Sequence, residues 1–412
     1  MSGTSYAGGA SSRYLLMGST LLLLMGGLVM VYSASSVADY VNFSDSAYHF
    51  KRHAISILIG AIALFVAQAF DYHKLRRMAW AFYFGCIASL VAVLLIGVGK
   101  FGAQSWIDLG PTTIQPSEYA KLACIMVTAV LFCQLEERTL RFKDLWSRLA
   151  LSVGGVIFLV MLQPDMGTTM SIVLSVYLVL LLAGVRWTVL LGTATVGMAG
   201  VMTLMFAASY RAARMRAFLN PWADPQGSGY QSIQAMLAFG SGGIDGVGLG
   251  LSRQKFFYLP AAHNDFIFAI IGEELGLLGT VAVVAAFLVL TYAGIRIALG
   301  TRDLFGRLLA GGLVAMIAVQ AVMNMAAVTG LMPVTGITMP LVSYGGSSMT
   351  FMMLCVGIVL SVSKYGSRGA RVATSGVTKK EIPGARDDER RRNRRPYLSS
   401  VDGGRGTARR RA

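Results

Sequence analysis

The sequence predicts an all-α fold that crosses a membrane about ten times, and three observations support this prediction. Of the 412 residues, 55% are hydrophobic and only 14% are charged, whereas roughly 25% of an ordinary soluble domain is charged. The apolar residues are gathered into blocks of about 20, the length of helix that crosses a hydrocarbon core about 30 Å thick. The blocks lack the alternation typical of membrane barrels, and lipid cannot hydrogen-bond to exposed backbone, so the spans are predicted to be helices.

Ten apolar blocks are the predicted spans. The first begins at Tyr14, is longer than the apolar core of a signal peptide and has only Arg13 as a basic residue before it, so we expect it to be retained as a helix. The predicted spans are residues 14–34, 53–70, 79–98, 118–134, 149–162, 168–183, 187–208, 275–295, 308–328 and 346–363.

The basic residues predict the orientation of these spans. If the amino terminus is cytoplasmic, the cytoplasmic segments hold 27 Lys and Arg and the external segments hold 8. Short loops carry the clearest signal under the positive-inside rule, and residues 73–77 agree with this orientation. Both termini are therefore predicted to be cytoplasmic. The chain then divides into a short amino-terminal segment (1–13), a transmembrane domain (14–363) and a tail (364–412).

The tail, residues 364–412, carries 15 basic and 5 acidic residues and almost no large apolar ones. Such a composition cannot bury a core, so the tail is predicted to be disordered. A basic tether beside a membrane favours anionic lipid or an acidic partner over nucleic acid. We expect anionic lipid as its partner and no nucleic acid.

One external segment, residues 209–271 between predicted spans 7 and 8, is long enough to carry function. The apolar residues of 230–237 recur at helical spacing, which suits a short helix lying on the membrane surface or packed on the bundle. Six glycines lie between Gly240 and Gly250. No strand precedes them and no P-loop lysine follows in pattern, so flexibility or close packing explains them better than a nucleotide loop.

Ionisable groups within or beside an apolar span are costly, and are therefore functional candidates. These groups are Glu118, Lys121, Asp165, Asp265, Glu273 and Glu274. Glu118 and Lys121 are one helical turn apart, so they could form an ion pair of either structural or functional importance. Asp165 stands where one span ends and the next begins, and could simply cap the sixth helix.

No metal site is predicted. His49 and His53 are four residues apart and would share a helix face, but no third ligand is visible, which argues against zinc. The four cysteines lie inside apolar blocks without C-x-x-C spacing, so neither a disulfide nor zinc is indicated. No cofactor is identified, and a role for a divalent cation stays open.

Asp265 lies at the boundary between a polar loop and the apolar run that begins at Phe266. A carboxylate in this situation could be a general base, cap the following helix or pair with an arginine. No second carboxylate is placed as an acid, which argues against ordinary glycoside hydrolysis. An anionic leaving group such as pyrophosphate needs no acid and is stabilised by cations instead. The segment supplies Arg253 and four further basic residues that we expect to bind substrate, namely Arg211, Arg214, Arg216 and Lys255.

Several blocks of the chain resemble the SEDS family of bacterial shape, elongation, division and sporulation proteins, whose branches include FtsW and RodA. The resemblance covers roughly residues 14–363. It rests on PAAHNDFIFAIIGEELG (260–276), GAQSWIDLG (102–110), QPSEYAK (115–121), QPDMGT (163–168), NPWADPQGSGYQSIQA (220–235), SRQKFFYLP (252–260) and PVTGITMPLVSYGGSS (333–348). The blocks at 220–235 and 252–260 look more like the division and sporulation branch, which favours an FtsW-like protein over RodA.

The resemblance implies a peptidoglycan glycosyltransferase that polymerises lipid II, with inversion, on the outer face of the bacterial cytoplasmic membrane. It also implies a class B penicillin-binding protein and other division proteins as partners, and enrichment at the division septum. Asp265 occupies the position of the family's essential aspartate. Trp106, Glu118 and Lys121 match positions that the family associates with activity, and we expect them to bind substrate.

The chain departs from the family pattern at three positions. The family commonly has Glu where this chain has Ala261, Thr where it has Asn264, and Arg where it has Ser105. Any function of that glutamate or arginine is therefore in doubt here. Two other functions stay open. A lipid II flippase would suit the many spans, although no inverted repeat is visible, and a non-catalytic scaffold would only recruit the transpeptidase.

Overall fold

The computed structural model describes residues 4–100, 103–108, 113–206 and 209–366. The described chain is mostly helical. Its helices are α1 (Thr4–Phe43), α2 (Tyr48–Ala69), α3 (His73–Ile96), α4 (Pro116–Glu136), α5 (Phe142–Leu162), α6 (Met166–Leu182), α7 (Trp187–Phe206), α8 (Ser209–Leu219), α9 (Tyr230–Gly242), α10 (Ile267–Gly300), α11 (Leu304–Val328) and α12 (Gly346–Tyr365). The tail predictions fall on residues outside the described part.

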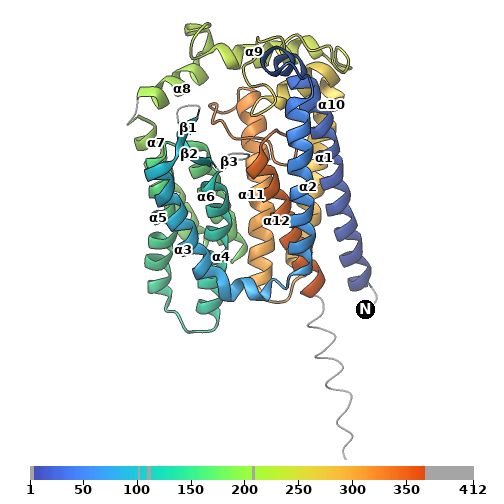
Figure 1. The fold of residues 1–412 in the computed structure, drawn as a ribbon. Coiled ribbons are helices and arrows are strands. Elements are labelled where there is room, and N and C mark those ends of the chain that lie inside the picture. Colours follow the sequence, from blue (N-terminus) through green and yellow to red (C-terminus); the bar gives the residue numbers. More distant parts are fainter. Residues whose placement is uncertain (1–3, 101–102, 109–112, 207–208, 367–412) are drawn as a thin grey trace, which may run out of the picture. The chain divides into compact units, whose positions relative to one another are not determined.

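The prediction of an all-α polytopic membrane fold is confirmed. Within the described ranges, eight helices are long and apolar enough to cross a membrane: α1, α2, α3, α4, α5, α10, α11 and α12. The two remaining predicted spans coincide with α6, which has 17 residues, and α7, which has 20. Figure 1 shows that α1 begins and α12 ends at the same end of the bundle, as an even number of crossings requires. A total of ten crossings stays a prediction.

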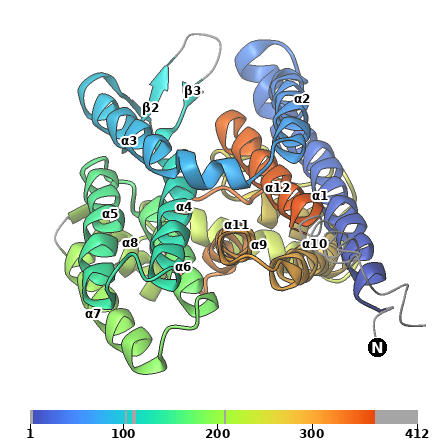
Figure 2. The ribbon, with the colours of Figure 1, turned by 90° about the horizontal axis from the view of Figure 1, so that it is seen from below.

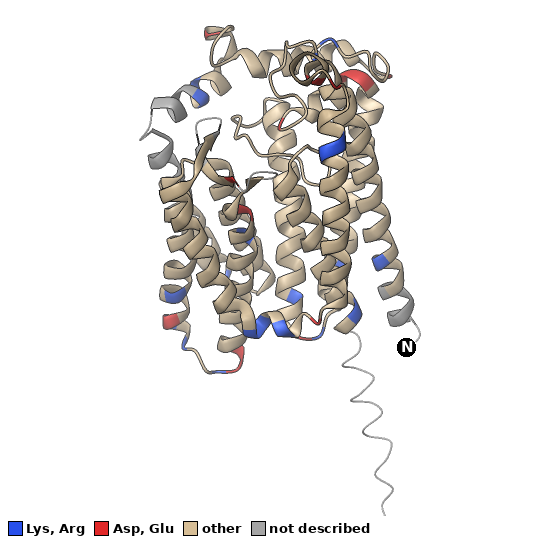
Figure 3. Ribbon diagram, viewed as in Figure 1, with Lys and Arg blue, Asp and Glu red and all other residues tan. Residues whose placement is uncertain are grey.

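Basic residues gather at the end of the bundle where α1 begins, as Figure 3 shows. The helices α8, α9 and the start of α10 lie at the opposite end (Figure 1). Because short cytoplasmic loops are enriched in Lys and Arg, this distribution favours a cytoplasmic position for the end with α1 and an external one for α8 and α9.

The centre of the bundle is formed by α4 and α11, which pack against each other and against α6 (Figure 2). On one side α1 packs on α10, and α2 packs on α12; on the other side α3 and α5 flank α4. Almost every side chain of α4 is buried, including the charged Glu118 and Lys121. The bundle therefore places charged groups in its interior, where only other protein groups can satisfy them.

A small antiparallel sheet was not predicted. Its strands β1 (Val98–Lys100), β2 (Ala103–Asp108) and β3 (Thr113–Ile114) are ordered β1-β2-β3 and connect α3 to α4. Trp106 lies on β2, opposite Val98 of β1. Ser105, also on β2, donates from its hydroxyl to the carbonyl of Gln163 at 3.3 Å, which fastens the sheet to the loop between α5 and α6.

The helix α10 begins at Ile267, well before the predicted start near residue 275. The predicted span coincides with the part of α10 that follows an interruption at Gly276, and Glu273 and Glu274 lie in the part before it. Both carboxylates are buried in the helix and satisfied there: the backbone N–H of Arg253 donates to Glu273 at 2.9 Å, and the Ser33 hydroxyl donates to Glu274 at 2.7 Å.

The glycines between α9 and α10 allow two backbones to touch, which confirms the close-packing interpretation of the glycine-rich stretch. The helix α10 is interrupted at Gly276, where φ is +64°. A Cβ atom at Gly276 would lie 2.3 Å from the carbonyl oxygen of Ile244. Within the glycine-rich stretch, a Cβ atom at Gly246 would lie 2.2 Å from the carbonyl oxygen of Glu274, so only glycine fits at either position. The predicted helix near residues 230–237 is α9, and it packs on α10.

Candidate functional site

The loop that carries Asp265 is fastened to the bundle through its backbone. The Asn324 side chain, on α11, donates from Nδ2 to the Asp265 carbonyl at 2.7 Å and to the Ile337 carbonyl at 2.8 Å. The Tyr344 N–H donates to the His263 carbonyl at 3.0 Å. The loop before α10 and the loop before α12 are therefore tied to each other and to α11, which fixes where the Asp265 side chain starts.

The Asp265 carboxyl group does not cap α10 and forms no ion pair with the described arginines of α8. The N-cap residue of α10 is Phe266, and no side-chain bond caps this helix. Within the described part of the chain, neither Arg214 nor Arg216 forms an ion pair with Asp265. Asn324 thus holds the backbone of Asp265, and the Asp265 carboxylate accepts from its own backbone N–H. Pairing with Arg211 falls outside the described side chains.

Burial of the Asp265 carboxyl group raises its pKa to about 6, and the positive charge of Arg214 acts in the opposite direction. The residue keeps some contact with solvent. Removal of water from a carboxylate favours its neutral form, whereas a nearby cation favours the charged form. The result is a group that is mostly ionised at neutral pH and whose proton affinity is higher than usual, which suits a general base.

Glu118 and Lys121 form the predicted ion pair, with Lys121 Nζ 2.8 Å from Glu118 Oε1. The Lys121 side chain is only 1% exposed, and the Glu118 side chain is only 7% exposed. Lys121 also donates to Gln320 Oε1 at 2.7 Å, and the Ser348 hydroxyl donates to Glu118 Oε2 at 3.2 Å. The pair is thus satisfied by α11 and α12, as buried charges require.

Two amides of α11 connect this ion pair to the backbone of Asp265 through residues 337–338. Gln320, which accepts from Lys121, donates from Nε2 to the Thr338 carbonyl at 3.2 Å. Asn324 lies one helical turn further along α11 and binds the neighbouring Ile337 carbonyl together with that of Asp265. Two residues expected to bind substrate and the expected base therefore belong to one network.

The amides Gln320 and Asn324 were missed from the sequence because only ionisable residues were sought inside the spans. Both side chains are buried, at 1% and 2% exposure. Amides within an apolar helix also need partners and are therefore a signal of the same kind.

Asp165 is the N-cap of α6, which confirms the capping interpretation. Its Oδ1 accepts from the Thr168 N–H at 2.9 Å. Its Oδ2 accepts from Gln115 Nε2 at 3.0 Å and from the Ser117 hydroxyl at 3.4 Å. Asp165 therefore joins the start of α6 to the start of α4, the helix that carries the buried ion pair.

The basic residues of the external segment have different surroundings. Arg214 and Arg216 are exposed, and Arg214 donates to the Val334 carbonyl at 3.4 Å. The Arg211 side chain lies outside the described part. Lys255 is buried, donates to the Gly250 carbonyl and has its Nζ 3.7 Å from Glu274 Oε1. The exposed arginines can reach an anionic ligand, whereas Lys255 stabilises the loop, and its role in substrate binding stays a prediction.

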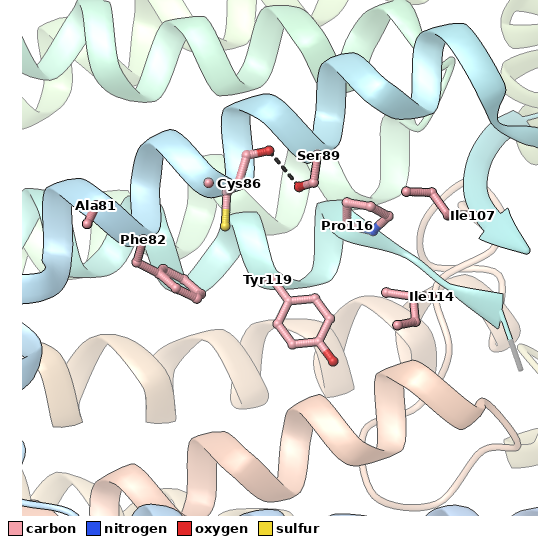
Figure 4. A pocket seen from close by; sticks show the side chains of 9 residues that line it. Ala81, Phe82, Cys86, Ser89, Ile107, Ile114, Pro116 and Tyr119 are labelled. Atoms are coloured by element: carbon pink, nitrogen blue, oxygen red, sulfur yellow. Dashed lines mark hydrogen bonds between the residues drawn. The ribbon is translucent and has the colours of Figure 1, made fainter. Parts of the chain in front are cut away.

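An apolar pocket of about 500 Å³ opens between α3 and α4 (Figure 4). Its lining residues come from α3, β2, β3 and the start of α4: Ala81, Phe82, Gly85, Cys86, Ser89, Ile107, Ile114, Pro116 and Tyr119. Figure 4 shows the rings of Phe82 and Tyr119 on the same side of the pocket as the Cys86 sulfur. Such a lining suits a hydrocarbon chain.

Metal-binding side chains are not grouped in the described ranges: no three of His, Cys, Asp or Glu are arranged there to hold an ion. His49 and His53 do share a helix face, since both rings lie near Tyr344, at centroid distances of 4.7 and 5.9 Å. All four cysteines are free and buried.

Residues 13–368 match the sequence model of the cell cycle proteins FtsW, RodA and SpoVE. The chain belongs to this FtsW/RodA/SpoVE family. Two of its relatives within the family are similar over most of their length. Stage V sporulation protein E of Bacillus subtilis is 45% identical over 349 residues, which are 84% of this chain and 95% of the relative. The probable peptidoglycan glycosyltransferase FtsW of Trichlorobacter lovleyi is 42% identical over 339 residues, 82% of this chain and 89% of the relative.

Solved structures of the FtsW/RodA/SpoVE family share the fold. A chain of a peptidoglycan synthase complex, described as coordinating polymerization and crosslinking, superimposes with a TM-score of 0.70 at 28% identity, over 86% of this chain and 97% of that one. Thermus thermophilus RodA, a rod shape determining protein, gives a TM-score of 0.63 at 28% identity, over 85% and 96% of the two chains.

Two of the three departures from the family pattern lie in the Asp265 loop. Ala261 has a φ of +50°, a left-handed conformation that is uncommon for residues other than glycine. Its carbonyl accepts from the Asn264 N–H at 2.9 Å, which closes a tight turn immediately before Asp265. The turn that presents the aspartate thus forms in this member of the family with alanine and asparagine at these positions.

Proposed function

We propose that this chain is an FtsW-like peptidoglycan glycosyltransferase that polymerises lipid II, and that Asp265 is its catalytic base. The assignment of the base rests on the surroundings of the Asp265 carboxyl group. It neither caps α10 nor pairs with Arg214 or Arg216, and burial raises its pKa to about 6. A positioned base contributes roughly 10² to 10⁴ to the rate of such a reaction.

In the proposed reaction, the Asp265 carboxylate accepts the proton of the 4-hydroxyl group on the acceptor sugar. The oxygen of this hydroxyl then forms a bond to the anomeric carbon of the donor, while the bond from that carbon to the pyrophosphate oxygen breaks. The α-linked donor becomes a β-linkage, so the configuration is inverted. The polyprenyl pyrophosphate leaves as an anion and needs no proton from an acid.

The departing pyrophosphate would be stabilised by the arginines of α8. Arg214 and Arg216 are exposed at the external end, and Arg214 is near enough to Asp265 to lower its pKa. Arginine forms bidentate, charge-assisted hydrogen bonds with phosphate oxygens. We assign Arg211 to the same role from its sequence position, three residues before Arg214.

The remaining substrate contacts are proposed from the lining of the apolar pocket and from the burial of the other expected substrate-binding residues. The apolar pocket between α3 and α4 would take part of the polyprenyl chain, since its lining is almost wholly apolar. Trp106, partly buried on β2, would contact the substrate beside it. Glu118 and Lys121, which pair with each other and bond to Ser348 and Gln320 inside the bundle, would support the substrate site rather than bind a free anion.

A class B penicillin-binding protein is the proposed partner, and the division septum is the proposed location, together with other division proteins. The relative named FtsW and the solved complex that coordinates polymerization with crosslinking support this assignment. Depletion should produce filaments or blocked septa, whereas rounding of cells with normal septation would instead favour an elongation role.

The reaction is tested by reconstituting the purified chain with lipid II and candidate transpeptidases. Wild-type protein should form glycan strands, and Asp265→Asn should insert, fold and bind its partner but form none. Asparagine retains the size and hydrogen-bonding capacity of aspartate but cannot accept the proton. Near-normal turnover of Asp265→Asn would refute the assignment of the base. Movement of headgroups without polymer would indicate a flippase, and partner binding alone a scaffold.

A further inference from the structure

A cluster of rings lies where α1 and α2 meet the Asp265 loop. The ring of His49, at the start of α2, is 4.4 Å from the ring of His263 and 4.7 Å from the ring of Tyr344, measured between centroids. The rings of His263 and Tyr344 are 5.6 Å apart. His49 thus contacts the two loops whose backbones are tied together by the bond from the Tyr344 N–H to the His263 carbonyl.

The orientation of the His49 ring is fixed by Asp39 of α1. The Asp39 carboxylate is completely buried and bonds to His49 Nδ1. It also accepts from the His49 N–H at 2.9 Å and from the Ser35 hydroxyl at 2.8 Å. A histidine whose Nδ1 is bonded to a carboxylate is held in one ring orientation, so its other edge and its faces are presented in a defined direction.

The segment from His263 to Asp265 is therefore held from two sides. From α11, Asn324 binds the Asp265 carbonyl at 2.7 Å. From α2, the His49 ring packs on His263, two residues before Asp265. The two supports approach from different helices, and only the one from α2 is itself braced by a buried carboxylate.

We infer that Asp39 and His49 are positioning residues for the polymerisation reaction, which hold the Asp265 loop in its reactive placement through His263 and Tyr344. This inference rests on the proposed role of Asp265 as the base. A misplacement of about 1 Å in a reacting group can reduce a rate roughly 10²-fold. On this inference, Asp39 and His49 act by preventing this misplacement.

The alternative is that the cluster contributes only packing. Packing alone is served by apolar residues, whereas a buried carboxylate bonded to an imidazole loses its hydration and is stable only with good geometry. Loss of packing lowers the amount of folded protein. Loss of positioning lowers the rate of each folded molecule and changes the surroundings of Asp265, and these effects are separable.

Few charged and titratable groups face His263, Asp265 and Tyr344, so a pH profile of turnover can be assigned to them. His263 is faced by His49 and His53 from α2 and by Asp39 from α1. Arg214 from α8 faces Asp265. Arg52 and Tyr48 from α2 and Asp39 from α1 face Tyr344. Burial and the neighbouring His49 lower the pKa of His263 to about 4, so His263 stays neutral in the range where Asp265 titrates.

The experiment compares turnover of lipid II by the purified full chain with its partner transpeptidase. The variants are His49→Ala, His49→Phe, His49→Asn and Asp39→Asn. His49→Phe keeps a ring but loses the bond to Asp39, and His49→Asn keeps a donor near the Nδ1 position but loses the ring. Lys51→Ala is the matched control, since Lys51 is exposed two residues away on α2 and pairs with Asp45 at the surface.

We expect His49→Ala to lower kcat by about tenfold to a hundredfold with little change in KM. The variants His49→Phe, His49→Asn and Asp39→Asn should each lower kcat by a smaller factor. Lys51→Ala should leave kcat unchanged. A loosened loop would expose the Asp265 carboxyl to water, so the acidic limb of the pH profile should move below pH 6. A folded His49→Ala with normal kcat, or with reduced kcat and an unmoved limb, would overturn the inference.

Two further comparisons keep the test decisive. If His49→Ala does not fold, His49→Phe and Asp39→Asn are judged by the same kcat and pH criteria. Asp265→Asn is measured in parallel. Retained turnover in Asp265→Asn would overturn the base and the inference together, whereas an inactive Asp265→Asn beside unaffected His49 and Asp39 variants would overturn only the inference.

Discussion

The segment from Pro260 to Gly276 carries carboxylates at both ends, and their surroundings are opposite. Glu274, in α10, is completely buried and bonded to the Ser33 hydroxyl, the Ser252 N–H and, at 3.7 Å, the Lys255 ammonium. Asp265, before α10, keeps contact with solvent and its carboxylate joins no ion pair with the described arginines. An acidic residue at the edge of a span is therefore not functional by its position alone. Its partners decide whether it stabilises the fold or remains free to react.

Of the variants that test this comparison, we expect Glu274→Ala to have the largest effect, and this effect is on stability. Glu274→Ala would leave the Lys255 ammonium buried without its partner, which costs roughly 3 to 5 kcal/mol of unfolding free energy. The midpoint of thermal unfolding in detergent measures this loss. The matched control is Glu137→Ala, which breaks a half-exposed pair with Arg76 at 2.6 Å and should cost about 0 to 1 kcal/mol. Equal losses in the two variants would show that the Glu274 cluster is not a stabilising one.

Asn324→Ala tests the Asp265 side of the comparison, because it removes a support of the Asp265 backbone and leaves the partners of Glu274 unchanged. The variant loses bonds to the Asp265 and Ile337 carbonyls. Unsatisfied buried groups cost about 1 to 3 kcal/mol each. We expect kcat to fall by roughly tenfold or more in the folded protein, since the loop that presents the base is loosened. A normal kcat would mean that the remaining contacts suffice to place Asp265.

The difference between the two carboxylates was only partly predictable from the sequence. Local relations were predicted well: the boundary position of Asp265, the spacing of Glu118 and Lys121, and the cap at Asp165 depend on neighbours in the chain. The contact between Lys121 and Gln320 joins residues 199 positions apart, and the one between Ser33 and Glu274 joins residues 241 apart. Nothing local marks such partners.

The short strands escaped prediction for a related reason. β3 has only 2 residues, too few to show alternation, and the 6 residues of β2, AQSWID, do not alternate between apolar and polar. The ring cluster of His49, His263 and Tyr344 likewise unites three segments that are distant in the sequence. Spacing on α2 predicted the shared face of His49 and His53, but not which loop that face would meet.

The pH dependence of turnover tests the state of Asp265 directly. A base must be deprotonated to act, so kcat/KM should be constant well above pH 6 and fall as the pH drops through about 6, the pKa of Asp265 raised by burial. One unit below the pKa, about a tenth of the ionised form remains, and activity should fall about tenfold. A limb near the ordinary aspartate value of about 4 would indicate that the carboxyl is solvated in the working enzyme.

The smallest effect is expected from removing the basic tail. Similarity to the family ends at residue 368, and the residues that form the proposed site all lie before Gly366. The tail adds mostly charge and few large apolar residues, so its attraction to anionic lipid or a partner falls with salt, and we expect it to add nothing to the chemistry. Truncation after Gly366 should leave lipid II turnover in detergent nearly unchanged, while binding to vesicles with anionic lipid weakens. A folded truncated protein that no longer polymerises lipid II would place part of the catalytic machinery in the tail, and Asp265 would then no longer suffice to explain the site.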